Sequence, residues 1–329
     1  MVPIDFTEPK LLMAYYHFIG IVSLLLNSLG IYLLQFHCEK LGTFRFWLMS
    51  YQVMCLVFDF SVTYLGKPLL LIPMYAVYMV GFVTTWLGKY LPVGLVWACD
   101  MIVLQFLVLI LSFIKKHRTI AALCSSWKIH WIFDHIFGLS VISAILIGDY
   151  FSSFLFPSEE EKWRIITTSY PQYKKDFQSL PNFIIFVKNT KTLAMIFSII
   201  IAATIVAVGF FFLLANMLHL MRLLKSQISP VNYQKHAESV LCLIVQITTA
   251  VLSIAPIGLF GLALALELPH AQLLSNIAAS WFITHSSFTM VSLLVVFPPF
   301  KVFMRQSVRR FQSKIIKVKV SPVAAGRPM

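Results

Sequence analysis

The sequence predicts an all-α membrane protein: a bundle of seven transmembrane helices, followed by a C-terminal amphipathic helix on the membrane surface. Of the 329 residues, 59% are hydrophobic and only 12% are charged, about half the charged share of a typical soluble domain. The apolar residues form runs of 20 or more, the length that a helix needs to cross about 30 Å of hydrocarbon. Helices can face lipid because they satisfy their own backbone hydrogen bonds. The alternating strands of a membrane barrel are not found in the sequence.

Seven apolar runs are clear, and each predicts one membrane span. They cover residues 12–36, 46–66, 92–114, 132–153, 192–218, 240–266 and 273–297. A further run, residues 69–88, is also long enough to cross a membrane. Pro73 and Gly81 interrupt this run and favour a kinked helical extension followed by an outer loop. We therefore expect seven spans within a membrane domain of residues 1–300, followed by a basic tail of residues 301–329.

The distribution of Lys and Arg predicts which end of the chain is cytoplasmic. With seven helices, 2, 4, 3 and 8 of these residues lie in segments 37–45, 115–131, 219–239 and 298–329, which is 17 of the 26. Cytoplasmic loops carry such an excess, so the C-terminus is predicted to be cytoplasmic. An eight-helix arrangement also puts 17 of the 26 on the side of the C-terminus. The distribution of charge therefore does not decide on which side of the membrane the N-terminus lies. The net charge of +13 thus indicates topology and contact with anionic membrane lipids, not nucleic acid.

The one long connection, residues 154–191, has two possible roles. It is either a solvated connector or a lid over a ligand entrance. The connection contains three prolines, Pro157, Pro171 and Pro181, so we do not expect regular secondary structure over its whole length. It contains no cysteine, so no disulfide can tie it to Cys99.

The C-terminal segment has the periodicity of a basic amphipathic helix. One face carries Phe300, Phe303, Met304, Val308, Phe311, Ile315 and Val318, and the other carries mainly Lys301, Arg305, Arg309 and Lys317. Such a helix is expected to lie on the inner leaflet. The alternative is a disordered basic tail.

The first 75 or so residues carry a specific set of matches to a known family. The run begins at Tyr16-His17-Phe18-Ile19-Gly20 and continues through Ser23, Asn27, Ile31-Tyr32-Leu33-Leu34, Phe44-Arg45-Phe46, Tyr51-Gln52, Cys55, Asp59, Thr63, Leu65, Pro68 and Pro73. Weaker matches follow at Lys116-His117, at Pro256 and at Phe297-Pro298-Pro299-Phe300-Lys301. In these residues the chain resembles the nematode serpentine receptors of class I (Sri type), with class H as the close neighbour.

The resemblance implies a chemosensory G-protein-coupled receptor with seven helices and an extracellular N-terminus. Such a receptor lies in the plasma membrane of sensory neurons, binds a small-molecule or peptide ligand within the bundle, and signals to a heterotrimeric G protein. Two motifs of rhodopsin-like receptors are missing, Asp-Arg-Tyr after the third helix and Asn-Pro-x-x-Tyr in the seventh. Lys115-Lys116-His117-Arg118 and Phe297-Pro298-Pro299-Phe300 stand there instead, so rhodopsin-like switching details are not carried over.

Polar groups inside the predicted spans are candidates for function, because placing them in lipid is costly. Asp59 can pair with Asn27 or with a bound cation and change partners on activation, or the pair can simply fix helix packing. Pro256 can act as a hinge or as a passive kink. The residues expected near a ligand in the outer half of the bundle are Asp100, Gln105, Asn276, Trp281, His285, Ser286 and Ser287.

The basic residues at the cytoplasmic ends of the helices suit both lipid phosphates and a G protein. The set expected to face a G protein is Lys115, Lys116, His117, Arg118, Arg222, Lys225 and Lys235, with His236 beside it. No catalytic, cofactor or metal motif accompanies them: His130 and His135 stand without a second histidine box. The alternative function is a multi-pass transporter or channel with an even number of helices.

Overall fold

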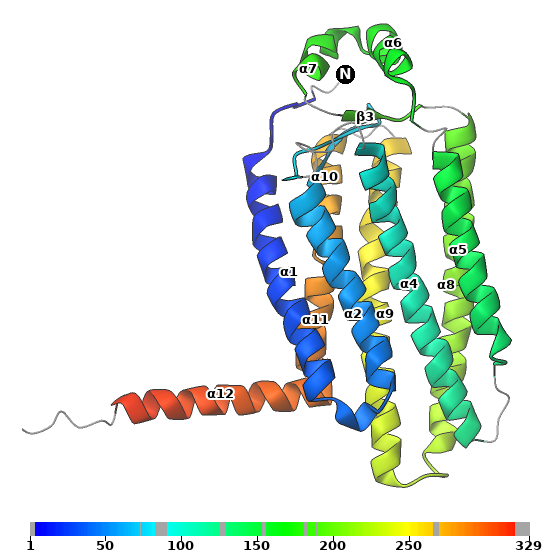
Figure 1. Cartoon of the computed structure of the whole chain (residues 1–329), viewed down its shortest axis with the longest axis vertical. Coiled ribbons are helices and arrows are strands. Elements are labelled where there is room, and N and C mark those ends of the chain that lie inside the picture. Colours follow the sequence, from blue (N-terminus) through cyan, green and yellow to red (C-terminus); the bar gives the residue numbers. More distant parts are fainter. Residues whose placement is uncertain are drawn as a thin grey trace, which may run out of the picture.

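The computed structural model describes residues 4–72, 74–82, 91–124, 129–152, 156–180, 183–187, 190–265 and 270–319. Long helices run side by side to form a bundle (Figure 1). A small sheet and two short helices cover one end of the bundle, here called the sheet end, where the N-terminus also lies. The last helix lies crosswise at the opposite end, here called the α12 end.

The predicted seven-helix bundle is confirmed. Six helices are long and apolar enough to cross a membrane alone. They are α1 (Lys10–Phe36), α2 (Phe44–Phe60) with its π-helical continuation η2 (Ser61–Gly66), α4 (Leu91–Leu123), α5 (Ile132–Ser152), α8 (Thr190–Leu224) and α9 (Pro230–Ala265). The seventh span is broken into α10 (Ala271–Ile283) and α11 (His285–Val296), which meet at 43°.

Three helices continue beyond the apolar runs that predicted them. The third span was expected to end at residue 114, but α4 runs to Leu123, and the fifth was expected to end at residue 218, but α8 runs to Leu224. The sixth was expected from residue 240, but α9 begins at Pro230. These additions lie at the α12 end (Figure 1). A 3₁₀ turn, η1 (Glu39–Leu41), joins α1 to α2 there and packs against α9.

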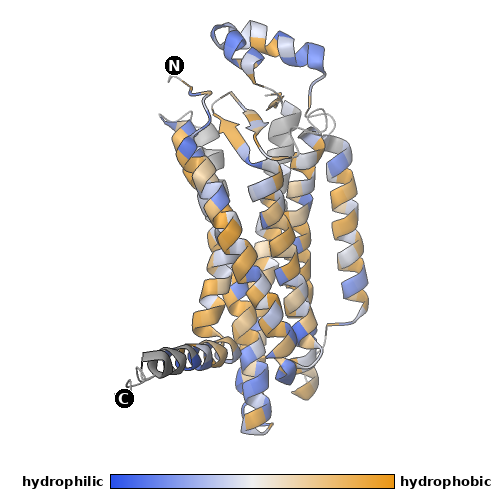
Figure 2. Cartoon of the chain, turned by 60° about the vertical axis from the view of Figure 1, so that its left-hand side comes forward, coloured by the Kyte–Doolittle hydropathy of each residue, from blue (hydrophilic) through white to orange (hydrophobic). Residues whose placement is uncertain are grey.

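The lateral surface of the bundle is apolar. Hydrophobic residues cover the helices along their length, and hydrophilic ones gather on the short helices beyond the sheet end (Figure 2). Large side chains such as Phe18, Leu146 and Phe211 are exposed on this surface, whereas polar ones such as Asn27 and Asp59 are buried. This distribution suits a bundle surrounded by lipid, where helices associate through packing and hydrogen bonds.

A three-stranded antiparallel sheet closes the sheet end. It has the order β1 (Pro68–Leu71), β2 (Ala76–Met79), β3 (Phe183–Ile185). The expected kinked helical extension is therefore wrong for residues 68–71 and 76–79, which pair as the two strands of a hairpin; Pro73 lies outside the described residues. The chain leaves η2 at Lys67, whose φ is 45°, and reverses at Tyr75, whose φ is 52°. Residues 83–88 of the same apolar run lie outside the described residues.

The long connection contains more regular structure than its prolines predicted. Helix α6 (Glu159–Ser169), turn η4 (Pro171–Tyr173) and helix α7 (Lys174–Ser179) precede β3. The Ser158 hydroxyl caps α6 by accepting from the backbone N–H of Glu161 at 3.3 Å, and three glutamates occupy its first turn, where the helix dipole favours negative charge. Pro157 precedes α6 and Pro171 begins η4, so each stands where a missing N–H is tolerated. Pro181 lies outside the described residues.

The predicted C-terminal helix is present as α12 (Pro298–Lys319). It lies crosswise to the bundle (Figures 1 and 2). Phe300 at its start is fully buried and meets Phe297 edge-on at 5.0 Å, while Arg305 and Arg309 are exposed. The disordered-tail alternative is thus wrong up to Lys319, and residues 320–329 lie outside the described residues.

Candidate ligand-binding site

Five buried polar side chains from three helices meet inside the bundle and form what we call the Asp59 cluster: Ser23 and Asn27 of α1, Gln52 and Asp59 of α2, and Ser286 of α11. The hydroxyls of Ser23 and Ser286 both donate to Oδ2 of Asp59. The Asn27 amide donates to the same oxygen at 3.3 Å and to Ser286 Oγ at 3.2 Å. The Gln52 amide donates to Asn27 Oδ1.

The Asp59 cluster holds the first, second and seventh spans together through one carboxylate that is only 1% exposed. Asn27 and Asp59, which the sequence singled out as partners, are in direct contact. Among the described residues, Oδ1 of Asp59 and Oε1 of Gln52 have no hydrogen-bond partner. The cluster therefore retains unused acceptor capacity, which a rearrangement of its partners can use.

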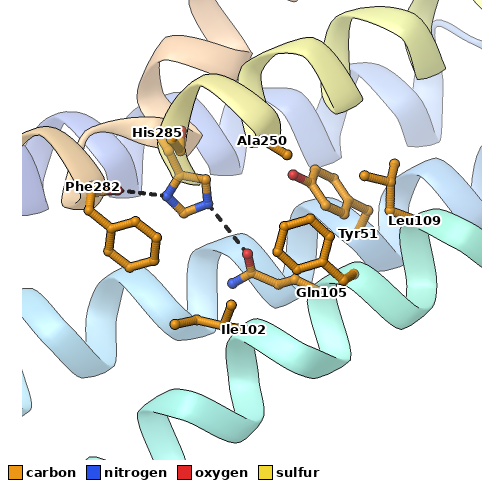
Figure 3. Close-up of a pocket in the computed structure, with 9 residues that line it drawn as sticks. Tyr51, Ile102, Gln105, Leu109, Ala250, Phe282 and His285 are labelled. Atoms are coloured by element: carbon orange, nitrogen blue, oxygen red, sulfur yellow. Dashed lines mark hydrogen bonds between the residues drawn. The ribbon is translucent and has the colours of Figure 1, made fainter. Parts of the chain in front are cut away.

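A cavity of about 40 Å³ lies between α2, α4, α9 and the broken seventh span (Figure 3). Helix α4 lines one side with Ile102, Gln105, Phe106 and Leu109. The other side is lined by Tyr51, Ala250, Ser253, Phe282 and His285. Two residues expected to meet a ligand, Gln105 and His285, are thus brought together in one site.

His285 and Gln105 form the polar contact of this cavity. Nε2 of His285 lies 3.3 Å from Oε1 of Gln105 (Figure 3), and Nδ1 lies 3.0 Å from the carbonyl oxygen of Phe282. The Phe282 ring stacks on the imidazole at 5.6 Å, and the Gln105 amide donates to the carbonyl of Met54 at 3.4 Å. These contacts hold the imidazole in one orientation at the cavity wall.

The seventh span breaks immediately before His285 because side chains occupy the backbone carbonyl that would continue the helix. The carbonyl of Ser280 accepts from the hydroxyl of Thr284 at 2.7 Å and from that of Tyr15 at 3.2 Å. The N–H of Thr284 bonds instead to the carbonyl of Trp281 at 3.0 Å. Such back-bonding by threonine bends helices. The break therefore needs neither proline nor glycine.

The other residues expected at the ligand site lie elsewhere. Trp281 is 54% exposed on the lateral surface. Asp100 is near enough to Asp149 of α5 for their charges to interact, and it does not line the cavity. Asn276 and Ser287 do not line it either, and Ser286 belongs to the Asp59 cluster. Pro256 lies within α9, and its side chain is outside the described residues.

At the α12 end, the four consecutive basic residues of α4 have internal partners. Arg118 forms a bidentate ion pair with Asp134 of α5, with both N–O distances at 2.8 Å, and Lys115 lies 3.2 Å from the same carboxylate. Lys116 is 5% exposed, with its ammonium 4.9 Å from the ring of Phe44. His117 is 3% exposed and contacts Asn216 of α8 at 2.8 Å.

The remaining cations expected to face a G protein are accessible. Arg222 and Lys225 lie at the end of α8, and Lys235 lies in the first turns of α9. All three are exposed. These three exposed cations, here called the basic patch, are therefore accessible at the α12 end, while Lys116 and His117 stay inside the bundle.

Sequence reasoning missed several residues of both sites. Ser23 precedes Asn27 by four residues and Gln52 precedes Asp59 by seven, so each shares a helix face with a residue that was recognised. That spacing was a usable signal. Tyr51, Ser253 and Phe282 line the cavity because helices distant in sequence come together, and their local sequence carries no comparable signal.

Comparison with known proteins places the chain in a family. A family model described as serpentine type 7TM GPCR chemoreceptor Sri matches residues 2–304. A search of curated proteins found no match. The family is one of multi-pass receptors of the plasma membrane, with ligands and G proteins as partners in general, and it is not an enzyme family. Because the matched region covers nearly the whole chain, the protein belongs to the Sri family of serpentine seven-transmembrane G-protein-coupled chemoreceptors.

Proposed function

We propose that this protein binds a small extracellular ligand in the cavity between α2, α4, α9 and the seventh span, and that it signals to a heterotrimeric G protein at the α12 end. The observation that carries the proposal is the junction of two sites at consecutive residues. His285 lines the cavity, and Ser286 donates to Asp59. The sensory neuron is the cell type that the family resemblance favours.

Ligand binding is proposed to act on the break in the seventh span. A ligand that displaces His285 together with the backbone at the start of α11 would also move Ser286. Oδ2 of Asp59 then loses a donor, and its unpartnered Oδ1 becomes available to a new one. A ligand that favours one arrangement of the Asp59 cluster over the other shifts the population of receptor states. Pro256 is proposed as a hinge in α9 that follows this change.

The α12 end has features that suit a G protein. The basic patch of Arg222, Lys225 and Lys235 is exposed in the present state. Lys116 and His117 are buried behind it and become accessible only if the ends of α4, α8 and α9 separate. Separation would also affect Lys115 and Arg118, which hold α4 to α5 through Asp134. The proposed G-protein surface is therefore partly formed now and completed on activation.

The sheet end is proposed to be extracellular, with α6 and α7 as a lid. The N-terminal segment crosses this end: Phe6 packs against Phe177 at 5.2 Å. Gln272 holds it to α10 by two hydrogen bonds with the Asp5 backbone, at 3.1 and 2.7 Å. The N-terminal segment is thus held against α7 and against α10. A covering fixed by these contacts restricts access to the cavity below, which favours the lid over the solvated connector.

The test is nucleotide exchange on a heterotrimeric G protein in membranes that contain the full chain, measured against a panel of neutral and charged compounds. A compound that accelerates exchange should lose at least tenfold of its effect in His285→Ala. It should keep its effect in Phe288→Ala, the matched control, because Phe288 lies on the same helix with its side chain exposed. Equal responses of the two variants to every active compound would contradict the proposed site.

A further inference from the structure

The cavity that contains His285 sets a limit on the size of its occupant. Its volume is about 40 Å³, well below the roughly 150 Å³ of an engineered apolar cavity that binds benzene in another protein. The cavity is therefore too small for a benzene-sized molecule. Allowing for small side-chain adjustments, this limit corresponds to an organic molecule of about four or five non-hydrogen atoms.

The lining excludes a charged occupant. No Asp, Glu, Lys or Arg is among the nine residues that line the cavity, and most of its wall is apolar, from Ile102, Leu109, Ala250 and Phe282. Transferring an ion from water to such a wall without a counter-charge is prohibitive. Asp59 does not supply such a counter-charge, because it is not among the residues that line the cavity.

The pair of His285 and Gln105 offers a polar contact for an oxygen atom. The contact between His285 Nε2 and Gln105 Oε1 is 3.3 Å and that between Gln105 Nε2 and the Met54 carbonyl is 3.4 Å, both longer than the usual 2.9–3.0 Å. These weak contacts can be exchanged for bonds to a ligand at small loss. The Ser253 hydroxyl, by contrast, is committed to the carbonyl of Thr249 at 2.7 Å.

The covering of the bundle argues against a peptide. Every residue of β2 and β3 is buried, and Tyr16 of α1 ties the sheet down by donating to the carbonyl of Pro68 at 2.8 Å. A peptide chain reaching the cavity would have to displace this packed layer. A molecule of a few atoms needs only small openings.

We infer that the cavity takes a small uncharged organic molecule with one hydrogen-bonding oxygen, of the class of short-chain ketones and alcohols. The inference rests on the proposed function, because that assigns this cavity as the ligand site. The limit on binding energy per atom restricts a five-atom ligand to a dissociation constant no lower than the order of 10 µM. A receptor for such a ligand responds to ligand concentrations in the micromolar to millimolar range.

The experiment measures binding of 2-butanone to the purified full chain in lipid nanodiscs by saturation-transfer NMR. Ala250→Leu fills the cavity, and its matched control is Ala144→Leu, the same change at an exposed site on α5. We expect at least a tenfold loss of affinity in Ala250→Leu and none in Ala144→Leu. Size-matched butylammonium and butanoate should not compete with 2-butanone.

A second pair of variants covers the case in which the filled cavity does not fold. Leu109→Ala enlarges the cavity and should improve binding of 2-heptanone at least tenfold, whereas Leu146→Ala, at an exposed position on α5, should not. Tighter binding of 2-nonanone or butylammonium than of 2-butanone by the unmodified chain would overturn the inference. So would unchanged affinity for 2-butanone in a folded Ala250→Leu.

The binding and signalling experiments separate the two proposals. Exchange driven by a peptide or an ion, without binding of small neutral molecules, would overturn the ligand class and leave the receptor function standing. Cavity-dependent binding of 2-butanone without any effect of a ligand on nucleotide exchange would support the ligand class and count against the signalling role.

Discussion

His285 and Ser286 are consecutive residues that face two different buried sites. The imidazole of His285 lines the cavity and lies 3.3 Å from Gln105 of α4, while the hydroxyl of Ser286 donates to Asp59 of α2. Both follow the break at Thr284, which divides the seventh span into helices inclined at 43°. The two buried sites are therefore joined by a single peptide unit of the backbone.

The Asp59 cluster predicts a difference between two substitutions at one position. Asp59→Ala removes the acceptor of Ser23, Asn27 and Ser286 and leaves buried donors unsatisfied, which costs about 1–3 kcal/mol for each group left unpaired. Asp59→Asn keeps one oxygen acceptor in the same place and should cost less. The measurement is the thermal unfolding midpoint of each purified variant. Equal losses in both would show that the carboxylate position does not organise the three helices.

Close packing of α1 against η2 predicts that Gly20 tolerates no side chain. A Cβ at Gly20 would lie 2.7 Å from Thr63 Oγ1 and 3.1 Å from Thr63 Cβ, both parts of a short, stiff side chain. Gly20→Ala should therefore destabilise the protein by about 1–3 kcal/mol. At Gly138 on α5 nothing lies within 4 Å, so Gly138→Ala should be neutral or stabilising by up to about 1 kcal/mol. Chemical denaturation of both variants distinguishes these outcomes, and equal effects would contradict the described helix contact.

These relationships differ in how far the sequence predicted them. Long apolar runs gave the membrane spans, since a helix in lipid needs only local hydrogen bonds. The hairpin at residues 68–79 was missed because both faces of β2 are buried, which removes the alternation that identifies a strand, and because its partner β3 is about 100 residues away. Helix α6 was missed although Ser158 and Glu161 have the spacing of a capping box.

The residues of the candidate sites also differ in how far the sequence predicted them. Asn27 and Asp59 were recognised as costly groups in lipid, and their contact follows from the packing of α1 on α2. Gln105 and His285, which the sequence grouped by depth alone, line the same cavity. Trp281 of the same group is exposed, because depth along a helix does not define which face meets the bundle. The break at Thr284 depends on Tyr15, whose position only the folded bundle determines.

Cys38 serves as a reporter of the α12 end. Burial, with a contribution from Glu238, raises the pKa of the Cys38 thiol to about 12, so below that pH it is protonated and unreactive, and its reactivity grows with pH. At pH 8, iodoacetamide should label Cys124, which is partly exposed, long before Cys38, as followed by mass spectrometry. Because η1 packs against α9, an active compound that moves α9 should accelerate the labelling of Cys38. Labelling of Cys38 as fast as Cys124 in the unliganded chain would contradict its burial.

The ion pair between α4 and α5 predicts a measurable coupling. Arg118 and Asp134 form two parallel hydrogen bonds and are 18% and 15% exposed, so the pair is better shielded than an exposed surface pair, for which coupling is about 0.2–1 kcal/mol. A double-mutant cycle with Arg118→Ala and Asp134→Ala should give about 1 kcal/mol or more in unfolding free energy. The cycle Lys162→Ala with Glu159→Ala, where Glu159 is 78% exposed, is the control. A larger coupling energy in the control cycle would be inconsistent with the described ion pair between α4 and α5.

In the proposed arrangement, the ligand cavity faces one side of the membrane and the G-protein surface faces the other. This arrangement depends on an odd number of spans. The most direct measurement is antibody access to an epitope tag at Met1 on intact, unpermeabilised cells, with a tag after Met329 as the control. With seven spans and a cytoplasmic C-terminus, we expect the Met1 tag to be labelled and the Met329 tag to be labelled only after permeabilisation. If both tags are hidden while the protein is at the surface, the number of spans is even and the receptor arrangement is wrong.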